Sequence, residues 1–471
     1  MIENYLSDFV KNAYKIDEFI KYELETVEAV KLLNANRLDI IAKIIYLIEK
    51  DRCFDYAKSL YLEHIRVMTK DSFIEAGSNK QGKQAFIDAF EKLFEDLKTN
   101  GYDLNSLPVP VDRNYHIMDG AHRVAACFIL NIPVRIIKLD LEAIYDKYDY
   151  LYFRDRLMNE DYLDQIVLKY IEIKKNIACI NIWPSAKGND ESLKSLINDV
   201  VYYKEVKLNE NGAFNYLAQI YKEYSWAQNS GDGFSGVYRK LVPCFPTFDP
   251  VRVYFVETDN FDRILTLKEK IRDIYKIEKH SVHATDNIKE TIEMARILLS
   301  RNSIEFMNKC NSTKFKSTFE ILNDTSNYDL ENTVFTGSIV LALYGIREAN
   351  DLDFIDINNS KDSHNDYLDI YKLSLNDVIY NPNNYFIYFN IKFLKLEIIK
   401  QFKENRNEGK DKDDLKLIEM ILANSDKKNI KVTLLQTKRR VIAKAQGVIL
   451  KIAHKTGTYD LLRSIYKRIK K

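Results

Sequence analysis

The chain has 471 residues and a formal net charge of +1, with 46% hydrophobic and 30% charged residues. This length allows several domains, and this composition is typical of a globular protein rather than a disordered one. Five scattered cysteines without a CxxC pair argue against a disulfide framework and a zinc site, and favour the reducing cytoplasm. No apolar run is long enough to span a bilayer, and the N-terminal MIENYLSDFVKNAYK lacks the apolar region of a signal peptide.

Hydrophobic periodicity and turn residues predict an α/β (α+β) multidomain chain. Residues 1–65 are Lys/Glu-rich, contain no Gly or Pro, and are predicted to form a helical N-terminal region. The remaining regions are expected to be a module alternating helix and strand at 66–140, a mixed α/β region at 141–300, a second α/β module at 301–426 and a basic helical tail at 427–471.

The first candidate site lies in the module at 66–140. FIDAFEKLFEDLKTNGYD has the pattern of an amphipathic helix, LPVPVDRNYHIMDG that of a strand pair, and AHRVAACFIL that of a helix leading into the strand IPVRII. Asp119, Gly120, His122 and Arg123 therefore fall at a strand-to-helix turn. Glycine lets a phosphate approach the backbone, unpaired helix N–H groups attract it, and arginine binds its oxygens through a planar fork.

In order and spacing, residues 72–137 resemble the ParB/sulfiredoxin-like fold with its "DG-x-HR" box. The resemblance implies that the box holds nucleotide phosphates, with Lys80 and Lys83 upstream, and that ATP, or alternatively CTP, is bound. By position, Glu75 matches the glutamate that acts as base in serine-kinase relatives. The alternative for Glu75 is an acid in a polar surface loop, and the alternative for the box is a turn with a purely structural role. Sulfiredoxin chemistry needs a cysteine that this box lacks, and DNA partition is disfavoured because no helix-turn-helix follows.

The region at 141–300 resembles no known family. IACINIW and VRVYFVE are predicted strands, LTLKEKIRDIYKI and TDNIKETIEMARILLS are predicted helices, and Thr285 or Asp286 is the expected N-cap of the last. Packing or capping roles are favoured over phosphate contact for His280 and His283. The cations Lys268, Lys270 and Arg272 are expected to be solvated, and the loop SGDGFSGVYRK is a candidate lid.

The second candidate site lies in ENTVFTGSIVLALYGIREANDLDFIDI. Gly337 and Ser338 follow a strand and open a helix, and Asp351 and Asp353 follow after a gap of 12 residues. Residues i and i+2 of a strand point to one face, so these two carboxylates can share Mg²⁺. The pattern resembles the nucleotidyltransferase superfamily, which implies that Gly337 and Ser338 bind the terminal phosphates of a nucleotide.

The downstream IKFLKLEIIKQFKENRNEGKDKDDLKLIEMI resembles the tail of the same superfamily, with Lys400 at one of its basic positions. The superfamily has a third carboxylate on a following strand, and NYFIYFNIKF has none. Glu397 or Asp356 is a candidate substitute, and a degenerate, inactive copy is the alternative.

Residues 427–471 carry 14 Lys/Arg and one acid. Apolar residues near helical spacing among these cations predict a basic amphipathic helix, which either contacts a membrane surface or packs on its own domain.

Two nucleotide-handling modules in one chain predict a cytoplasmic phosphotransferase that uses Mg²⁺ and NTPs, with membrane association as the alternative if the basic tail contacts a membrane surface. The hypothesis is a kinase/nucleotidyltransferase that phosphorylates a small hydroxyl metabolite and activates it as an NDP derivative for bacterial capsule or other surface polysaccharide biosynthesis. The alternatives are a toxin- or defence-type nucleotidyltransferase acting on tRNA or protein, and a non-catalytic nucleotide-binding scaffold. A nucleic-acid partner is disfavoured because only the tail is basic.

Overall fold

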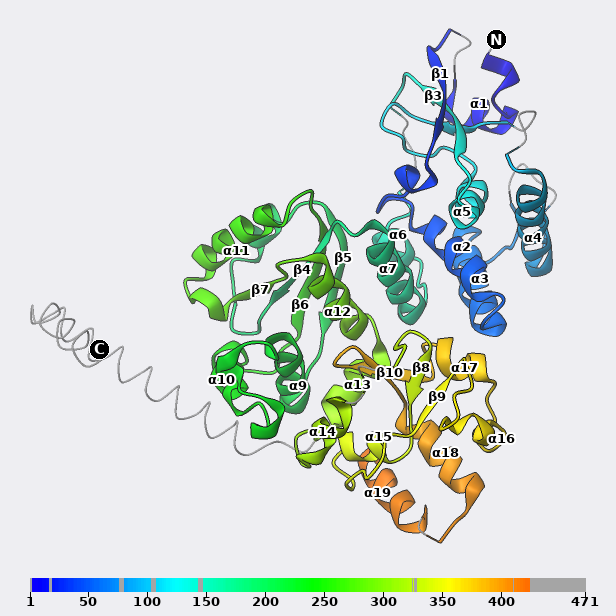
Figure 1. Cartoon of the computed structure of the whole chain (residues 1–471). Coiled ribbons are helices and arrows are strands. Elements are labelled where there is room, and N and C mark those ends of the chain that lie inside the picture. The colour runs from blue at the N-terminus through cyan, green and yellow to red at the C-terminus, as the bar shows by residue number, and fades with distance from the viewer. Residues whose placement is uncertain are drawn as a thin grey trace, which may run out of the picture.

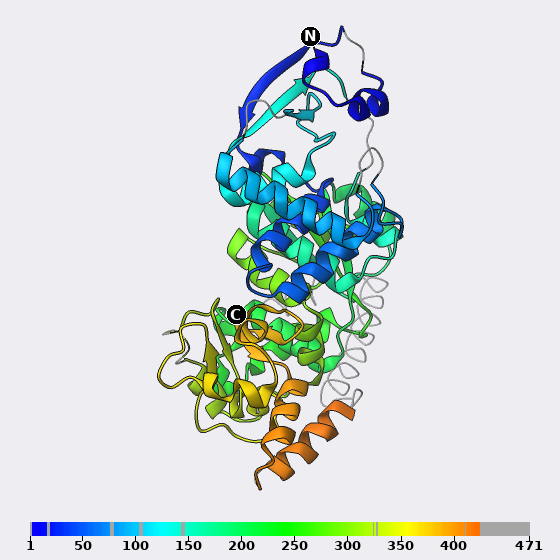
Figure 2. The ribbon, with the colours of Figure 1, turned by 90° about the vertical axis from the view of Figure 1, so that its right-hand side faces the viewer.

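The computed structural model describes residues 2–16, 19–75, 80–102, 107–142, 147–323, 325, 328–409 and 411–423. The basic tail predicted at 427–471 lies outside these residues. The described chain is a mixed α/β protein with small sheets, as the sequence predicts. Figures 1 and 2 place the N-terminal module at one end of the molecule and the C-terminal module at the other.

The N-terminal module contains a three-stranded sheet of order β1-β3-β2. Its elements are η1 Ile2–Asn4, α1 Asp8–Tyr14, β1 Tyr22–Val27, η2 Ala29–Leu32, α2 Leu38–Glu49, α3 Phe54–Met68, α4 Lys83–Asn100, β2 Val109–Val111, α5 Ala121–Leu130 and β3 Val134–Leu139. β3 pairs antiparallel with β1 and parallel with β2. The predicted regions 1–65 and 66–140 therefore share one sheet, so the boundary expected at residue 65 does not separate two units.

The middle module contains an antiparallel sheet of order β5-β6-β4-β7. Its elements are α6 Tyr150–Asp155, α7 Glu160–Lys174, β4 Ile177–Ile182, α8 Asp190–Leu196, β5 Val200–Val206, α9 Glu210–Tyr221, η3 Ser225–Ala227, η4 Ser230–Asp232, η5 Ser235–Val237, α10 Tyr238–Cys244, β6 Val251–Glu257, α11 Phe261–Tyr275, η6 Glu278–His280, β7 Val282–Ala284 and α12 Ile288–Leu298. β4 is buried on both faces because alternate side chains enter two different cores. β7 is the edge strand beside it.

Two local predictions for the middle module are corrected. The N-cap of α12 is Asn287, whose side chain accepts from Glu290 N at 2.9 Å, and not Thr285 or Asp286. The Thr285 hydroxyl accepts from the backbone N–H of Cys179 inside the core instead. The segment predicted as a loop and candidate lid, SGDGFSGVYRK, forms the short 3-10 turns η4 and η5 and the start of α10.

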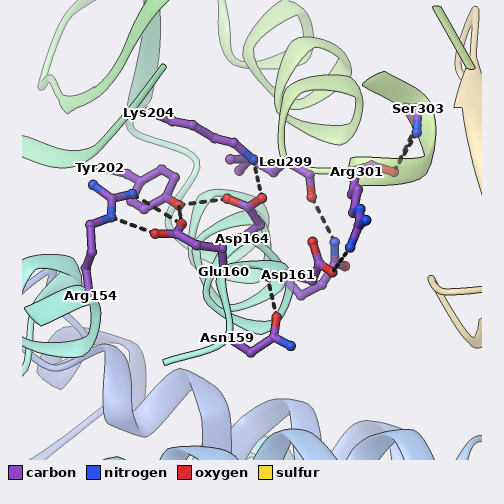
Figure 3. Close-up of polar contacts among 12 residues, drawn as sticks. Arg154, Asn159, Glu160, Asp161, Asp164, Tyr202, Lys204, Leu299, Arg301 and Ser303 are labelled. Atoms are coloured by element: carbon purple, nitrogen blue, oxygen red, sulfur yellow. Dashed lines mark hydrogen bonds and ion pairs between the residues drawn. The ribbon is translucent and has the colours of Figure 1, made fainter. Parts of the chain in front are cut away.

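Helix α7 makes polar contacts within the middle module and with the C-terminal module (Figure 3). The hydroxyl of Tyr202 on β5 donates to Asp164 at 2.7 Å, and Lys204 forms an ion pair with the same carboxylate. Burial raises the pKa of Asp164 to about 6. On the other side of the helix, Asp161 lies 3.7 Å from Arg301, the first residue of the C-terminal module.

The C-terminal module contains a sheet of order β10-β11-β8-β9. Its elements are α13 Arg301–Lys309, α14 Ser317–Asn323, β8 Thr333–Phe335, α15 Ser338–Leu343, β9 Phe354–Asp356, η8 His364–Tyr367, α16 Leu368–Tyr371, α17 Leu375–Tyr380, β10 Tyr385–Tyr388, β11 Ile391–Leu394, α18 Leu396–Arg406 and α19 Asp411–Ala423. β8 is central, pairing antiparallel with β9 and parallel with β11. None of the described helices is long and apolar enough to cross a membrane.

Candidate functional site

The turn between β2 and α5 contains the predicted phosphate-binding residues of the N-terminal module. Gly120 caps α5 with φ +94°, and a Cβ there would lie 3.1 Å from Val109 Cγ2 and 3.2 Å from Arg123 Nη2. The Arg123 guanidinium folds back across the helix N-terminus, donates to the Leu107 carbonyl oxygen and lies 4.0 Å from a carboxylate oxygen of Asp119. Asp119, Gly120 and Arg123 thus form one compact turn, and a phosphate bound there would compete with the Leu107 carbonyl for Arg123.

His122 faces the other way, into the space between α3, α4 and α5. Its Nε2 lies 3.0 Å from the Tyr61 hydroxyl, and its ring packs edge-on against Phe90, with the centroids 4.7 Å apart. Burial, and then the ammonium groups of Lys43 and Lys80, hold the pKa of His122 well below its usual value. The ring is therefore neutral near pH 7 and brings no positive charge to the turn. The sequence predicts that His122 and Arg123 lie together at the phosphate-binding turn, but the structure separates their side chains.

Glu75 and Lys80 face each other across a short β-bridge that precedes α4. Glu75 N donates to Lys80 O at 3.2 Å, and the Lys80 ammonium lies 2.8 Å from the Glu75 carboxylate. The Glu75 side chain is 37% exposed, and its charge acts on both Tyr61 and Lys43. The structure therefore brings Glu75, Lys80 and His122 together beside Tyr61, with one carboxylate open to solvent.

Beneath this cluster lies a buried ionic network that the sequence analysis missed. Arg37 donates to Asp39 at 2.8 and 3.0 Å and to the Ile117 carbonyl oxygen at 2.6 Å. Lys43, one turn further along α2, reaches Asp39 at 3.0 Å and His64 Nε2 at 3.1 Å. All four side chains are buried. The sequence feature that could have predicted this network is the presence of three charges in the otherwise apolar stretch RLDIIAKIIYLI.

The protonation state of His64 follows from its two contacts. Because Lys43 donates to Nε2, the ring proton sits on Nδ1, which donates to the Tyr61 carbonyl oxygen at 2.9 Å. Burial and the Lys43 charge lower the pKa of His64 from 6.5 to about 3.

This lowered pKa predicts an acid-dependent loss of stability. Below pH 6.5 the unfolded chain binds a proton that the folded chain does not, so the stabilisation is complete above pH 6.5 and is lost as pH falls toward 3. Relative to a His64→Gln variant, the wild type should lose up to about 1.4 kcal/mol of unfolding free energy per pH unit across this range. Urea denaturation of both proteins at several pH values measures the difference, and a difference independent of pH would contradict the neutral buried ring.

The C-terminal candidate site forms where β8 ends. Gly337 has φ +68°, and a Cβ at this position would lie 2.0 Å from Asp353 Oδ2, so only glycine leaves room for that carboxylate. The Ser338 hydroxyl donates to Asp351 Oδ1 at 2.9 Å. Thr336 N donates to Asp353 O at 2.9 Å, extending the β8–β9 pairing to the aspartate. Asp351 and Asp353 thus both converge on the Gly337–Ser338 turn, although they precede β9 rather than lying on it.

His364 is a member of this site that the sequence analysis missed. Its Nε2 lies 3.1 Å from Asp353 Oδ1. Burial raises the pKa of Asp353, but the contacts with His364 and the Ser338 backbone, together with the charge of Arg406, outweigh it and leave the pKa below its usual value. Asp353 is therefore ionised at neutral pH. No local sequence pattern links His364 to Asp353, because η8 follows the strand by a turn of irregular length.

Within the part of the chain that the structure describes, no third carboxylate joins this pair. Asp356 lies at the far end of β9, opposite Thr333, where it accepts from Ser360 N at 3.0 Å and from the Ser360 hydroxyl. Glu397 opens α18 and lines a separate cavity with Arg301. Among the described residues, no three His, Cys, Asp or Glu side chains are arranged to hold a metal ion.

Two carboxylates still suit Mg²⁺, which binds proteins through one or two carboxylates and takes its other ligands from phosphates and water. The converging oxygens of Asp351 and Asp353, the latter ionised, provide such a pair. The residues present therefore fit a Mg²⁺ ion that is held jointly with a nucleotide.

Two predicted phosphate-binding cations have other contacts in the structure. The Lys83 ammonium lies 5.2 Å above the centroid of the Phe73 ring. The Lys400 ammonium pairs with Glu404 at 3.4 Å and with Glu419 at 3.2 Å, which turns it toward α19. Neither contact places these cations at the predicted turns.

Comparisons of the chain with protein-family models, with curated proteins and with solved structures give no match. The function is therefore inferred from the residues of the two sites and their geometry.

Proposed function

We propose that the chain is a phosphotransferase with two separate nucleotide sites, one in each terminal module. The observation that carries the proposal is the convergence of Asp351 and Asp353 on the Gly337–Ser338 turn. Two adjacent carboxylates beside a glycine turn, where the backbone can approach a ligand closely, are suited to a metal-bound triphosphate. The two candidate sites share no residue, and the sheets of their modules lie at opposite ends of the molecule (Figure 2), which supports two separate reactions.

In the C-terminal module, Asp351 and Asp353 would hold the Mg²⁺ ion, and the Gly337–Ser338 backbone orients the terminal phosphates of the nucleotide. Mg²⁺, when bound, would supply charge neutralisation and activate the attacking oxygen. Ser338 fixes Asp351 and His364 fixes Asp353, so both carboxylates are oriented before substrate binds. The reaction is attack of a phosphomonoester oxygen on the α-phosphate of an NTP, with pyrophosphate as the leaving group.

In the N-terminal module, Glu75 accepts the proton of the substrate hydroxyl while that oxygen attacks the γ-phosphate of ATP, and ADP leaves. Lys80, 2.8 Å from Glu75, and Arg123 at the turn provide positive charge for the phosphates. The buried network of Arg37, Asp39 and Lys43 supports the floor of this site.

The two reactions form a sequence because the phosphomonoester made by the first is the nucleophile of the second. The product is an NDP-activated small alcohol or amino alcohol, the kind of donor that bacterial surface polysaccharide biosynthesis consumes.

Phosphorus NMR of the purified chain with Mg²⁺, each of the four NTPs and a pool of small alcohols and amino alcohols tests the proposal. The expected result is NDP with a new phosphomonoester, followed by pyrophosphate with a new diphosphate diester. Pyrophosphate alone would leave only the C-terminal reaction and would overturn the kinase part. No turnover with any NTP would overturn the whole proposal in favour of a binding protein.

A further inference from the structure

A cavity of about 490 Å³ opens at the edge of the middle sheet, beside β7. It lies among the end of α9, η3, the start of α10, helix α11 and η6; Figure 1 shows α11 and α10 on either side of β7. Its size falls within the range of small-molecule pockets, roughly 300–1,000 Å³. None of its lining residues belongs to either of the proposed sites.

The lining of the cavity is strongly cationic. Of the described residues that line it, one is a carboxylate, Asp286, and five are cations: Arg239, Lys240, Lys268, Arg272 and Lys279. Lys268 lies 3.4 Å from Asp286. Among the described residues, no carboxylate lies within 4.0 Å of the charged groups of Arg239, Lys240 or Lys279. Cations gathered in a concave, partly desolvated space repel one another and raise the local concentration of anions.

Two of these cations are only partly satisfied by the protein itself. Lys240 is buried, and its ammonium donates to the Lys279 carbonyl oxygen, a neutral partner. Arg272 pairs with Glu269 through Nη1 at 2.5 Å, but its buried Nε has no hydrogen-bond partner among the described residues. A buried donor without a partner costs free energy, so the guanidinium of Arg272 is incompletely satisfied.

Three aromatic rings form the other wall of the cavity. Tyr221 and Trp226 lie 4.9 Å apart between ring centroids, and Tyr224 lies 6.2 Å from Trp226. Tyr224 remains 47% exposed, so the group is open to an incoming ring. Nucleobases stack on aromatic faces of this kind, at about 1–3 kcal/mol per base.

We propose that this cavity is a third ligand site, which binds a nucleotide by its phosphates at the cations and by its base at the aromatic wall. Arg239, Lys240, Arg272 and Lys279 contact the phosphates, and Trp226 with Tyr224 contacts the base. The concave shape and the aromatic wall favour a nucleotide over a flat polyanionic surface. The site does not depend on the function proposed for the terminal modules, because its residues are distinct from theirs.

The two tryptophans of the chain give a direct test. Trp226 lines the cavity, whereas Trp183 is fully buried in the core of the middle module. Titration with ATP should quench tryptophan fluorescence in the full chain, and Trp226→Phe should remove the response. Because both terminal modules are also proposed to bind nucleotides, the affinity of the cavity is read from the Trp226 signal alone. ATP should bind more tightly than pyrophosphate or adenosine alone. An unchanged Trp226 signal at saturating ATP would overturn the site, and equal affinity for ATP and pyrophosphate would overturn the base contact.

Two double-alanine variants, one of cations that line the cavity and one of cations outside it, provide a matched comparison of ATP affinity. Arg239→Ala/Lys279→Ala removes two exposed lining cations and should weaken ATP binding about 10- to 100-fold. Arg263→Ala/Lys270→Ala removes two exposed cations of α11 that do not line the cavity, and it should leave the affinity unchanged. Equal weakening by both pairs would show a general charge effect and overturn the site.

Discussion

Replacement of both Asp351 and Asp353 by asparagine is expected to abolish pyrophosphate release, lowering its rate on the order of 10³-fold or more. The amides keep the shape of the side chains but remove the negative charge that holds Mg²⁺ and the nucleotide at the Gly337–Ser338 turn. The Ser338 contact with residue 351 survives because an amide oxygen also accepts, so the fold should remain intact. Pyrophosphate release measured at saturating NTP and Mg²⁺ gives the rate.

A matched control for this variant is Asp362→Asn/Asp366→Asn, which neutralises two exposed acids of the following segment without changing the converging pair. It should retain the wild-type rate. ADP formation at the N-terminal site should continue in the Asp351/Asp353 variant. Pyrophosphate release at the wild-type rate in that variant would rule out the C-terminal site as the nucleotidyltransferase centre.

The second large effect is expected at Asp39, the centre of the buried network. Asp39→Asn leaves the buried charges of Arg37 and Lys43 without a counter-charge, and breaking a buried ion pair in this way costs about 3–5 kcal/mol. Arg37 and Lys43, through their charges, outweigh burial and hold the pKa of Asp39 far below its usual value, so the carboxylate is ionised at all ordinary pH values. Urea denaturation at neutral pH measures the loss.

Asp55→Asn is the control for this prediction, because Asp55 is an exposed acid in the first turn of α3. It should change the free energy of unfolding by less than about 0.5 kcal/mol. If Asp39→Asn were as stable as this control, the ion pairs of the network would contribute little to the N-terminal module.

Much of the fold could be predicted because it is encoded locally. The helix AHRVAACFIL matches α5 residue for residue, and VRVYFVE matches β6. β1 was missed because its alternation, Tyr-Glu-Leu-Glu, is short and lies within a Lys/Glu-rich region, and its partner β3 lies more than 100 residues later in the chain. Pairing over that distance leaves no local pattern, so residues 22–27 were predicted to belong to the helical N-terminal region at 1–65.

The candidate sites likewise contain some residues that local sequence motifs predict and others that only the tertiary structure brings together. The convergence of Gly337, Ser338, Asp351 and Asp353 could be predicted because two short motifs flank one helix of a strand–helix–strand unit. His364 joins them through an irregular turn, which spacing does not predict. The cationic cavity is formed by four separate segments, and two of its cations, Lys268 and Arg272, were predicted to be ordinary solvated charges along α11. Only the tertiary structure shows that they face one space.

The most direct test of the two-site account is a phosphorus NMR comparison of Glu75→Gln with Asp351→Asn/Asp353→Asn on an acceptor that the wild type uses. Glu75→Gln should fail to make the phosphomonoester, yet convert a supplied phosphomonoester to the NDP derivative and pyrophosphate. The aspartate variant should make the phosphomonoester and ADP and stop there, and an equal mixture of the two variants should restore the final product. If each folded variant lost both reactions, and the mixture restored neither, the two reactions would share one site and the account would be contradicted.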